Sequence, residues 1–427
     1  MPVHSLPTEL IADILDTFVV LFPSHSQRLP NLASFALVNR TWSAISTGYL
    51  YRNLYLDSTA RDGILSALEQ NPWLAPMVRT LTLSGGKLDA VAFSRMQRLL
   101  VQCTNVRSLS YHCFDEVYLA DLTTFIGVAW PGLKYLRADQ SQHLFNLLGH
   151  LPHLEELIAS YIEVPASVHA LAAATVTPLP PSRPTTPGGS TSLNASGTPT
   201  RPVRPTFKLR RFDSGTSPSP LNFHLLTSSS QSSLRSLDLP LTSQTSQDLG
   251  SFTSLSFLTL TLAERYIPLD ADLPQPRQPG APASQRDDAR CLRRLKRVLS
   301  GAESAGVPLK RLEVYEPQYS GTSPFKAETF EEEDVLAAVP TSVEELDLST
   351  CAVGLEYIKK TFSPAPAPLT AGEEGEEEEA EEEAAEQERV CKGLRSIILG
   401  VRTAGTIEEA RGTMEVLAKR GVAVRWA

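Results

Sequence analysis

The chain has 427 residues, of which 42% are hydrophobic and 20% are charged, so it can bury a sizeable core. Its formal net charge is −9, but eleven glutamates fall within residues 373–388 and the rest of the chain is nearly neutral. This balance argues against nucleic-acid binding. The cysteines show no CxxC pair and no Cys/His cluster, which favours a reducing compartment and predicts no metal site; they stand at positions 103, 113, 291, 351 and 391.

An amphipathic helix is predicted at the N-terminus, over LPTELIADILDTFVVLF at residues 6–22. No basic region precedes this apolar run, and Asp13 and Asp16 interrupt it, so it does not read as a secretory signal. No other segment supplies the roughly 18 to 20 uninterrupted apolar residues of a membrane-spanning helix. We therefore expect a soluble protein without a membrane segment, made in the cytosol and working in the cytoplasm or the nucleus.

A polar loop is predicted next, around Pro23 and Pro30, with SHSQRLPN at 24–31 as its body. The segment NLASFALVNRTWSAISTGYLYRNLYL then favours two short helices that end in a strand-like tail near residue 56. The first 56 residues therefore form a module of their own.

A short pattern, apolar-x-x-apolar-x-apolar, recurs along the rest of the chain. Its central residues Leu81, Leu109, Leu136 and Leu157 are 28, 27 and 21 residues apart. Alternation over so short a span predicts strands with one buried face. The units are VRTLTL (78–83), VRSLSY (106–111), LKYLRA (133–138), LEELIA (154–159), LRSLDL (234–239), LSFLTL (255–260), LKRLEV (309–314), VEELDL (343–348) and LRSIIL (394–399), with a weaker unit around Leu209 and Phe212.

Helical spacing lies between several of these units. Residues 90–105 should bury Phe93, Met96, Leu100 and Val101, and residues 291–306 should bury Leu292, Leu295, Val298 and Leu299. The basic cluster RCLRRLKR at 290–297 is then the solvated face of a repeat helix rather than a nucleic-acid patch. A last helix over 406–421 is predicted from Thr406 and Glu409 as a capping box and from Gly421 as a stop, before a strand VAVRW.

Three stretches have the composition of flexible inserts: 166–205, rich in Pro, Ser and Thr, 268–288, and 363–388. The acidic run at 373–388 is interpreted as a solvated insert. The alternative is a polyanion that attracts a basic partner or competes for a basic substrate site.

No enzyme motif is present: GxSxG, HExxH, GxGxxG and the P-loop are all missing, and SGGK at 84–87 lacks the rest of a P-loop. His143, His150 and His153 are the nearest approach to a metal cluster, but Leu-Pro interrupts the helix before His153. We interpret them as a solvated helix end. The sequence predicts no catalysis, no cofactor and no metal.

The alternating strand and helix units resemble leucine-rich repeats, whose signature is LxxLxLxx(N/C)xL. VEELDLSTCAV is the best match, with Val343, Leu346, Leu348, Cys351 and Val353 in its five slots. In such repeats Cys351 would turn inward as a structural residue. The resemblance implies an α/β fold, an irregular leucine-rich-repeat solenoid in which parallel strands line a concave surface and disordered inserts interrupt the repeats.

The first module resembles the F-box, a three-helix motif. Its three signature segments match at Leu6, Pro7, Glu9, Leu10, Ile14 and Leu15, at Leu37, Val38, Asn39, Arg40 and Trp42, and at Tyr51 and Leu54. The whole chain is similar to F-box proteins of the fungal type with a C-terminal leucine-rich-repeat region. Its expected domains are an F-box at 1–56, repeats at 57–165, a linker at 166–205 and further repeats at 206–427.

This resemblance implies a partner and a function. The F-box would bind a Skp-family adaptor and, through it, the cullin and RING subunits of an SCF-type ubiquitin ligase, while the repeats would bind a protein substrate that the sequence does not identify. The residues facing the adaptor, or supporting that face, would be Leu6, Pro7, Leu10, Ile14, Leu37, Val38 and Trp42. Two alternatives remain: a repeat scaffold that acts without ubiquitination, and N-terminal helices that only cap the repeats.

Overall fold

The computed structural model describes residues 6–22, 25–57, 60–85, 88–139, 143–159, 207–215, 220–241, 249–262, 285–316, 331, 334–363, 392–400, 403 and 405–427. The chain divides into two compact units, Met1–Phe207 and Lys208–Ala427, and each is described by itself. The expected linker at 166–205 and the acidic run at 373–388 lie outside the described residues.

The first unit begins with three helices, α1 (Thr8–Leu21), α2 (His25–Ala36) and α3 (Arg40–Arg52). The prediction of a polar loop at 24–31 is wrong, because α2 begins at His25 and contains Pro30. A proline inside a helix removes one backbone hydrogen bond. Here Leu32 is fully buried and Phe35 packs beside it in the core of the three helices, so tertiary packing outweighs that loss.

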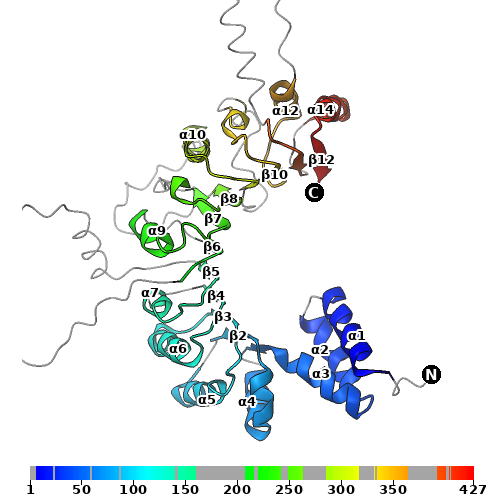
Figure 1. The fold of residues 1–427 in the computed structure, drawn as a ribbon, viewed down its shortest axis with the longest axis vertical. Helices are drawn as coiled ribbons and strands as arrows, with labels where there is room; N and C mark the ends of the chain where they lie inside the picture. The colour runs from blue at the N-terminus through cyan, green and yellow to red at the C-terminus, as the bar shows by residue number, and fades with distance from the viewer. Residues whose placement is uncertain are drawn as a thin grey trace, which may run out of the picture. The chain divides into compact units, whose positions relative to one another are not determined.

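A parallel sheet follows in the first unit, and its strands are β1 (Asn53–Leu56), β2 (Thr80–Ser84), β3 (Ser108–His112), β4 (Tyr135–Ala138) and β5 (Glu156–Ala159). The connecting elements are α4 (Arg61–Gln70), η2 (Pro72–Met77), α5 (Ala90–Leu100), α6 (Glu116–Ala129) and α7 (Leu144–Leu148), and Figure 1 shows α5 to α7 side by side along one face of the strands. Because β1 pairs with β2, the strand-like tail of the N-terminal module is part of this sheet.

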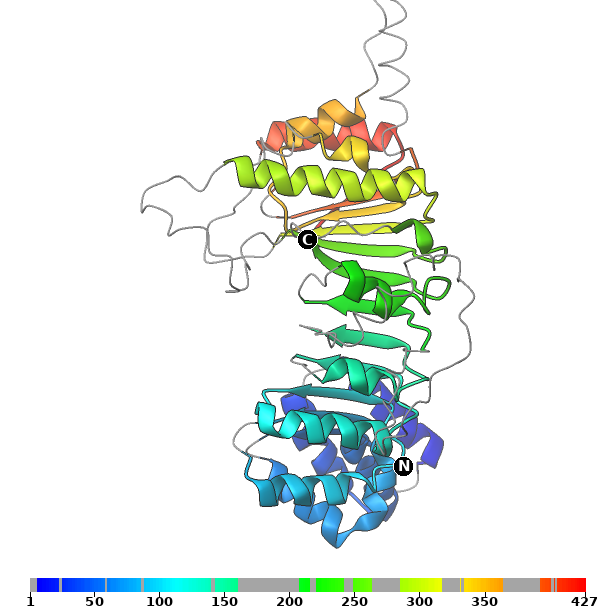
Figure 2. The ribbon, with the colours of Figure 1, turned by 90° about the vertical axis from the view of Figure 1, so that its left-hand side faces the viewer.

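The second unit is also a parallel sheet, formed by β6 (Arg211–Ser214), β7 (Ser236–Leu241), β8 (Phe257–Leu262), β9 (Arg311–Tyr315), β10 (Glu345–Leu348), β11 (Ser396–Leu399) and β12 (Ala423–Trp426). Its helical elements are α9 (Pro220–Thr227), η3 (Leu249–Ser251), α10 (Gln285–Ser304), η4 (Leu336–Ala338), α12 (Leu355–Phe362) and α14 (Ile407–Lys419). Figure 2 shows the long helix α10 lying along the strands. The chain is therefore an α/β protein with parallel strands, as predicted.

Every predicted repeat unit forms one of these strands, and the core lies between strands and helices. In both compact units, alternate strand residues are buried against the helices, because successive side chains of a strand point to opposite faces. The parallel register aligns these buried residues from strand to strand, and the aligned series are Leu54, Leu81, Leu109, Leu136 and Leu157 in the first unit and Phe212, Leu237, Leu258, Leu312, Leu346 and Ile397 in the second. We call the opposite side of each sheet its helix-distal face.

The predicted helices agree with the structure in most details. Leu292, Leu295, Val298 and Leu299 are buried on α10, although this helix begins at Gln285, within the stretch 268–288 that was expected to be a flexible insert. In α5 the prediction is wrong for Val101, which caps the helix and is exposed. Leu99 is buried in that helix, together with the expected Phe93, Met96 and Leu100.

Two local predictions near the end of the chain are confirmed. Thr406 and Glu409 form the capping box of α14, and Gly421 follows the helix with a φ of 74°. A positive φ favours glycine because a Cβ atom would be strained there.

Cys351 is fully buried, and its thiol donates a hydrogen bond to the backbone oxygen of Val314 at 3.1 Å, so it is a structural residue.

Candidate functional site

The three N-terminal helices share a small core of their own. Its buried members are Ile11, Leu15, Leu32 and Trp42. Partly buried apolar side chains complete it: Leu6, Phe18, Phe35, Ile45, Tyr49 and Leu50. Aromatic contacts connect the helices, since the Phe35 ring lies 5.3 Å from that of Phe18 and 5.5 Å from that of Trp42. A core this small leaves other apolar side chains of the module outside it.

Helix α1 begins at Thr8. Pro7 is its N-cap, and the backbone oxygen of Pro7 accepts a hydrogen bond from the amide of Ile11. Glu9 lies in the first turn, where the positive end of the helix dipole favours a carboxylate. This start places Ile11 and Leu15 toward the core and leaves the preceding positions Leu10 and Ile14 on the outside.

An apolar stripe runs along the outside of α1. Leu10 is 48% exposed, Ile14 is 43% exposed and Leu21 is 68% exposed. Positions separated by four and by seven residues lie on one face of a helix, so these three form a single stripe. The signature match did not include Leu21, although the spacing i, i+4, i+11 would have identified it.

A second exposed apolar pair lies in the turn between α2 and α3. Leu37 is 86% exposed, and Val38 is also exposed. The next residue, Asn39, caps α3: its side-chain oxygen accepts hydrogen bonds from the amides of Thr41 at 2.9 Å and Trp42 at 3.0 Å. This cap starts α3 so that Trp42 turns into the core, while Leu37 and Val38, which precede the cap, stay at the surface.

The seven predicted site residues therefore fall into two groups. Pro7, Leu10, Ile14, Leu37 and Val38 are exposed, whereas Trp42 is buried and Leu6 is half-buried against the same core. The last two support the module from inside. We call the exposed set Leu10, Ile14, Leu21, Leu37 and Val38 the N-terminal apolar surface.

Tyr49 fixes α3 against α1 and was not singled out from the sequence. Its hydroxyl donates to the Asp16 carboxylate at 2.7 Å and lies 3.3 Å from the backbone oxygen of Ala12. Burial, together with the neighbouring Asp16 charge, raises the pKa of Tyr49 to about 12. The hydroxyl therefore stays protonated and available as a donor. This contact holds the side of α1 that lies away from Leu10 and Ile14.

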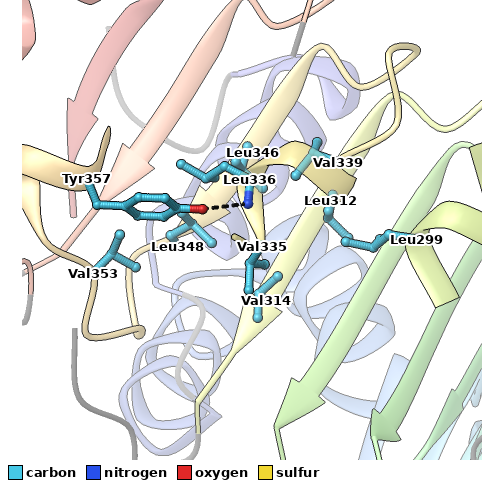
Figure 3. Close-up of a pocket in the computed structure, with 10 residues that line it drawn as sticks. All are labelled: Leu299, Leu312, Val314, Val335, Leu336, Val339, Leu346, Leu348, Val353 and Tyr357. Atoms are coloured by element: carbon cyan, nitrogen blue, oxygen red, sulfur yellow. Dashed lines mark hydrogen bonds between the residues drawn. The ribbon is translucent and has the colours of Figure 1, made fainter. Parts of the chain in front are cut away.

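The apolar cavity shown in Figure 3 belongs to the core of the second unit. Its volume is about 10 Å³, and residues such as Leu312, Leu346 and Val353 line it. Tyr357 also lines it, and its hydroxyl accepts a hydrogen bond from the backbone amide of Leu336 at 2.9 Å. A cavity of this size holds at most about one water molecule, so it is a packing defect rather than a ligand site.

The three histidines that come nearest to a metal cluster in the sequence do not form a metal site. His143 is the N-cap of the short helix α7, and His150 and His153 follow that helix as exposed residues. Among the described residues, no group of His, Cys, Asp and Glu has the geometry to hold a metal ion. Within the same part of the chain, no helix has both the length and the apolar character needed to cross a membrane.

Comparisons with known proteins add no relative. No protein-family model matches the chain, and no curated protein matches its sequence.

Proposed function

We propose that this chain is the non-catalytic, substrate-recognition subunit of an SCF-type cullin-RING ubiquitin ligase. In this proposal α1 to α3 form an F-box that binds a Skp-family adaptor, and the strand and helix units form leucine-rich repeats that bind a protein substrate. The observation that carries the proposal is the N-terminal apolar surface, which exposes five large apolar side chains on one short module.

Physical chemistry favours a protein partner for this surface. Exposed apolar patches rimmed by polar residues are typical of protein interaction sites. Burying one leucine or isoleucine side chain completely stabilises a complex by about 1.5 to 3 kcal/mol, and half of that gain remains for a side chain that is already half-buried. Leu10, Ile14 and Leu21 together would therefore contribute several kcal/mol to a complex.

The motif that resembles the F-box also has a consistent physical explanation. Asn39 supplies a helix cap, Trp42 fills the core, and Leu37 and Val38 are left at the surface. The resemblance implies that Leu37, Val38 and Trp42 face an adaptor or support that face. The chain itself would contribute binding only, holding a substrate lysine close to a ubiquitin-charged conjugating enzyme, a proximity effect.

Co-purification of the full chain with a Skp-family adaptor tests this proposal. The informative variant is the pair Leu10→Asp and Ile14→Asp, because it places two charges on the exposed stripe without touching the buried Ile11 and Leu15. We expect a stoichiometric complex for the unchanged chain and at least a hundredfold weaker binding for the variant, since an unpaired buried carboxylate is costly.

Val20→Asp is the matched control. Val20 is an exposed apolar residue of the same helix, but it lies about 80° around the helix from Leu10 and about 120° from Ile14. We expect this variant to bind the adaptor normally. A full chain that forms no adaptor complex would overturn the proposal and favour a repeat scaffold that acts without ubiquitination.

A further inference from the structure

The helix-distal face of the second unit carries charged residues in rows. The parallel register places equivalent side chains of neighbouring strands beside one another. From β6 to β10, the middle row reads Asp213, Asp238, Thr259, Glu313 and Asp347. Four of its five members are acidic.

This row contains two like-charged pairs in direct opposition. Asp213 is the register partner of Asp238, and Glu313 is the register partner of Asp347. Like charges directly opposite each other destabilise a sheet. Natural sequences break such local rules mainly where a function requires it, so the row is a candidate for recognition rather than for stability.

Arginines form ion pairs at the ends of the row. Arg211 lies 3.9 Å from the Asp213 carboxylate, and Arg311 pairs with Glu345 at 3.0 Å and with Asp347 at 3.6 Å. Among the described residues, no ion pair to Asp238 or Glu313 is found. Burial, and to a smaller extent the neighbouring carboxylates, raises the pKa of both groups, that of Asp238 to about 7, while Arg211 opposes the shift of Asp238 and Arg311 and a Thr259 hydrogen bond oppose that of Glu313.

Aromatic side chains lie next to the centre of the row. Phe257 precedes Thr259 by two residues on β8, and Tyr315 follows Glu313 by two residues on β9, so all four point to the same face. The guanidinium of Arg311 already lies over the Phe257 ring at 5.0 Å. Tyr315 is exposed and offers a second ring for the stem of a lysine or arginine.

We propose that this face binds a lysine- or arginine-bearing segment of a partner protein, with the cationic group held above Thr259 between Asp238 and Glu313. Adjacent strands are about 4.8 Å apart, so the Cα atoms of these two residues lie about 10 Å apart, and one cation between them can contact both carboxylates. The face repels nucleic acid and acidic peptides. The inference deepens the proposed function, on which it rests for one point only: that the partner is the recruited substrate.

Fluorescence anisotropy with the full chain tests the inference directly. The probes are a short labelled peptide of alternating lysine and serine and its counterpart of alternating glutamate and serine, both at physiological salt. We expect the lysine peptide to bind and the glutamate peptide not to bind. Replacing Asp238 and Glu313 by Asn and Gln should weaken lysine-peptide binding at least tenfold, because the shape of the site is kept and only its charge is removed.

Two controls distinguish peptide binding at Asp238 and Glu313 from attraction to other negative charges of the chain. Glu156→Gln neutralises a helix-distal carboxylate of the first unit, on β5, and should leave binding unchanged. Deleting residues 373–388 removes eleven glutamates, and the tenfold effect of the Asn and Gln variant should persist in this background. The variant relieves repulsion, so we expect it to keep its thermal stability, and a loss of binding cannot then be attributed to unfolding.

The outcomes also distinguish this inference from the proposed function. Equal binding of the lysine peptide by the unchanged chain and by the Asn and Gln variant, equal binding of both peptides, or no binding at all would overturn the inference while leaving the adaptor complex intact. Conversely, the Leu10→Asp and Ile14→Asp variant should lose the adaptor and keep the peptide.

Discussion

The helix-distal faces of the two units differ in chemistry although their strands follow the same pattern. In the first unit, β2 and β3 present Thr80, Thr82, Ser108 and Ser110, which are neutral hydroxyl side chains. In the second unit, the corresponding rows of β6 to β10 present mainly carboxylates and arginines. On the buried side, both units align leucines. Packing therefore constrains the helix-facing strand positions in both units, whereas the helix-distal positions are free to diverge toward different partners.

The largest effects are expected where the two units are alike. Leu109 in β3 and Leu258 in β8 are both fully buried and aligned with leucines on either side. Replacing either residue by alanine should lower the free energy of unfolding of its own unit by about 3 kcal/mol, because a buried cavity remains. Hydrogen exchange read by mass spectrometry, on peptides that cover β3 or β8, measures the two units separately.

Outward neighbours provide the matched controls for this test. Ser110→Ala in β3 and Thr261→Ala in β8 should each change the free energy of unfolding by less than about 1 kcal/mol. If the leucine substitution changed the free energy of unfolding of one unit no more than its control does, the two sheets would not share one packing scheme. The similarity between the two units would then be wrong.

A smaller effect distinguishes the units by pH. The folded-state pKa of Asp238 is raised to about 7, mainly by burial and then by Asp213 and Glu313, while Arg211 lowers it. The folded chain therefore holds a proton that the unfolded chain has lost, so this group makes stability fall as pH rises from about 4 to about 7. Asp238→Asn removes that dependence.

Urea unfolding at pH 4, 6 and 8 measures this prediction. We expect the variant and the unchanged chain to be similar at pH 4, and the variant to be more stable at pH 8 by on the order of 2 kcal/mol. Ser110→Asn in the first unit is the control and should shift both ends of the range equally. Parallel pH profiles for Asp238→Asn and the unchanged chain would show that the acidic row carries no strain.

The strands could be predicted from sequence because their alternation is local. Each unit such as VEELDL or LSFLTL became a strand with the expected buried leucines. The first half of the helix α2 was missed because the prolines of its segment were read as a loop signal, while the packing of this helix depends on residues elsewhere in the module. The F-box resemblance singled out Leu10, Ile14, Leu37 and Val38 as facing an adaptor or supporting that face, but it did not separate the exposed residues from the buried ones.

The acidic row could not be predicted, since it depends on register between distant segments. Asp238 and Glu313 are 75 residues apart in sequence and become second neighbours only when β7, β8 and β9 pair in parallel. No local pattern marks either residue, because a single outward carboxylate on a strand is ordinary. Only the parallel pairing shows that several of them share one row.

The smallest predicted effect concerns the ion pairs beside this row. Glu345 accepts from Arg311 at 3.0 Å and lies 3.5 Å from Arg425, whereas in the first unit Lys134 pairs with Glu155 at 2.7 Å. Exposed pairs contribute little. Double-mutant cycles to alanine, read by urea unfolding, should give a coupling energy of roughly 1 kcal/mol for Arg311 with Glu345 and below about 0.5 kcal/mol for Lys134 with Glu155.

The difference between these two coupling energies shows whether Arg311 is held in place or is free to approach Glu313. A strong coupling means that Arg311 is held between Glu345 and Asp347, with its guanidinium over Phe257, so it does not turn toward Glu313. Glu313 and Asp238 then remain available to a cationic group of a partner. A coupling no larger than that of the first unit would mean that Arg311 is free to neutralise Glu313, and the contrast between the two faces would disappear.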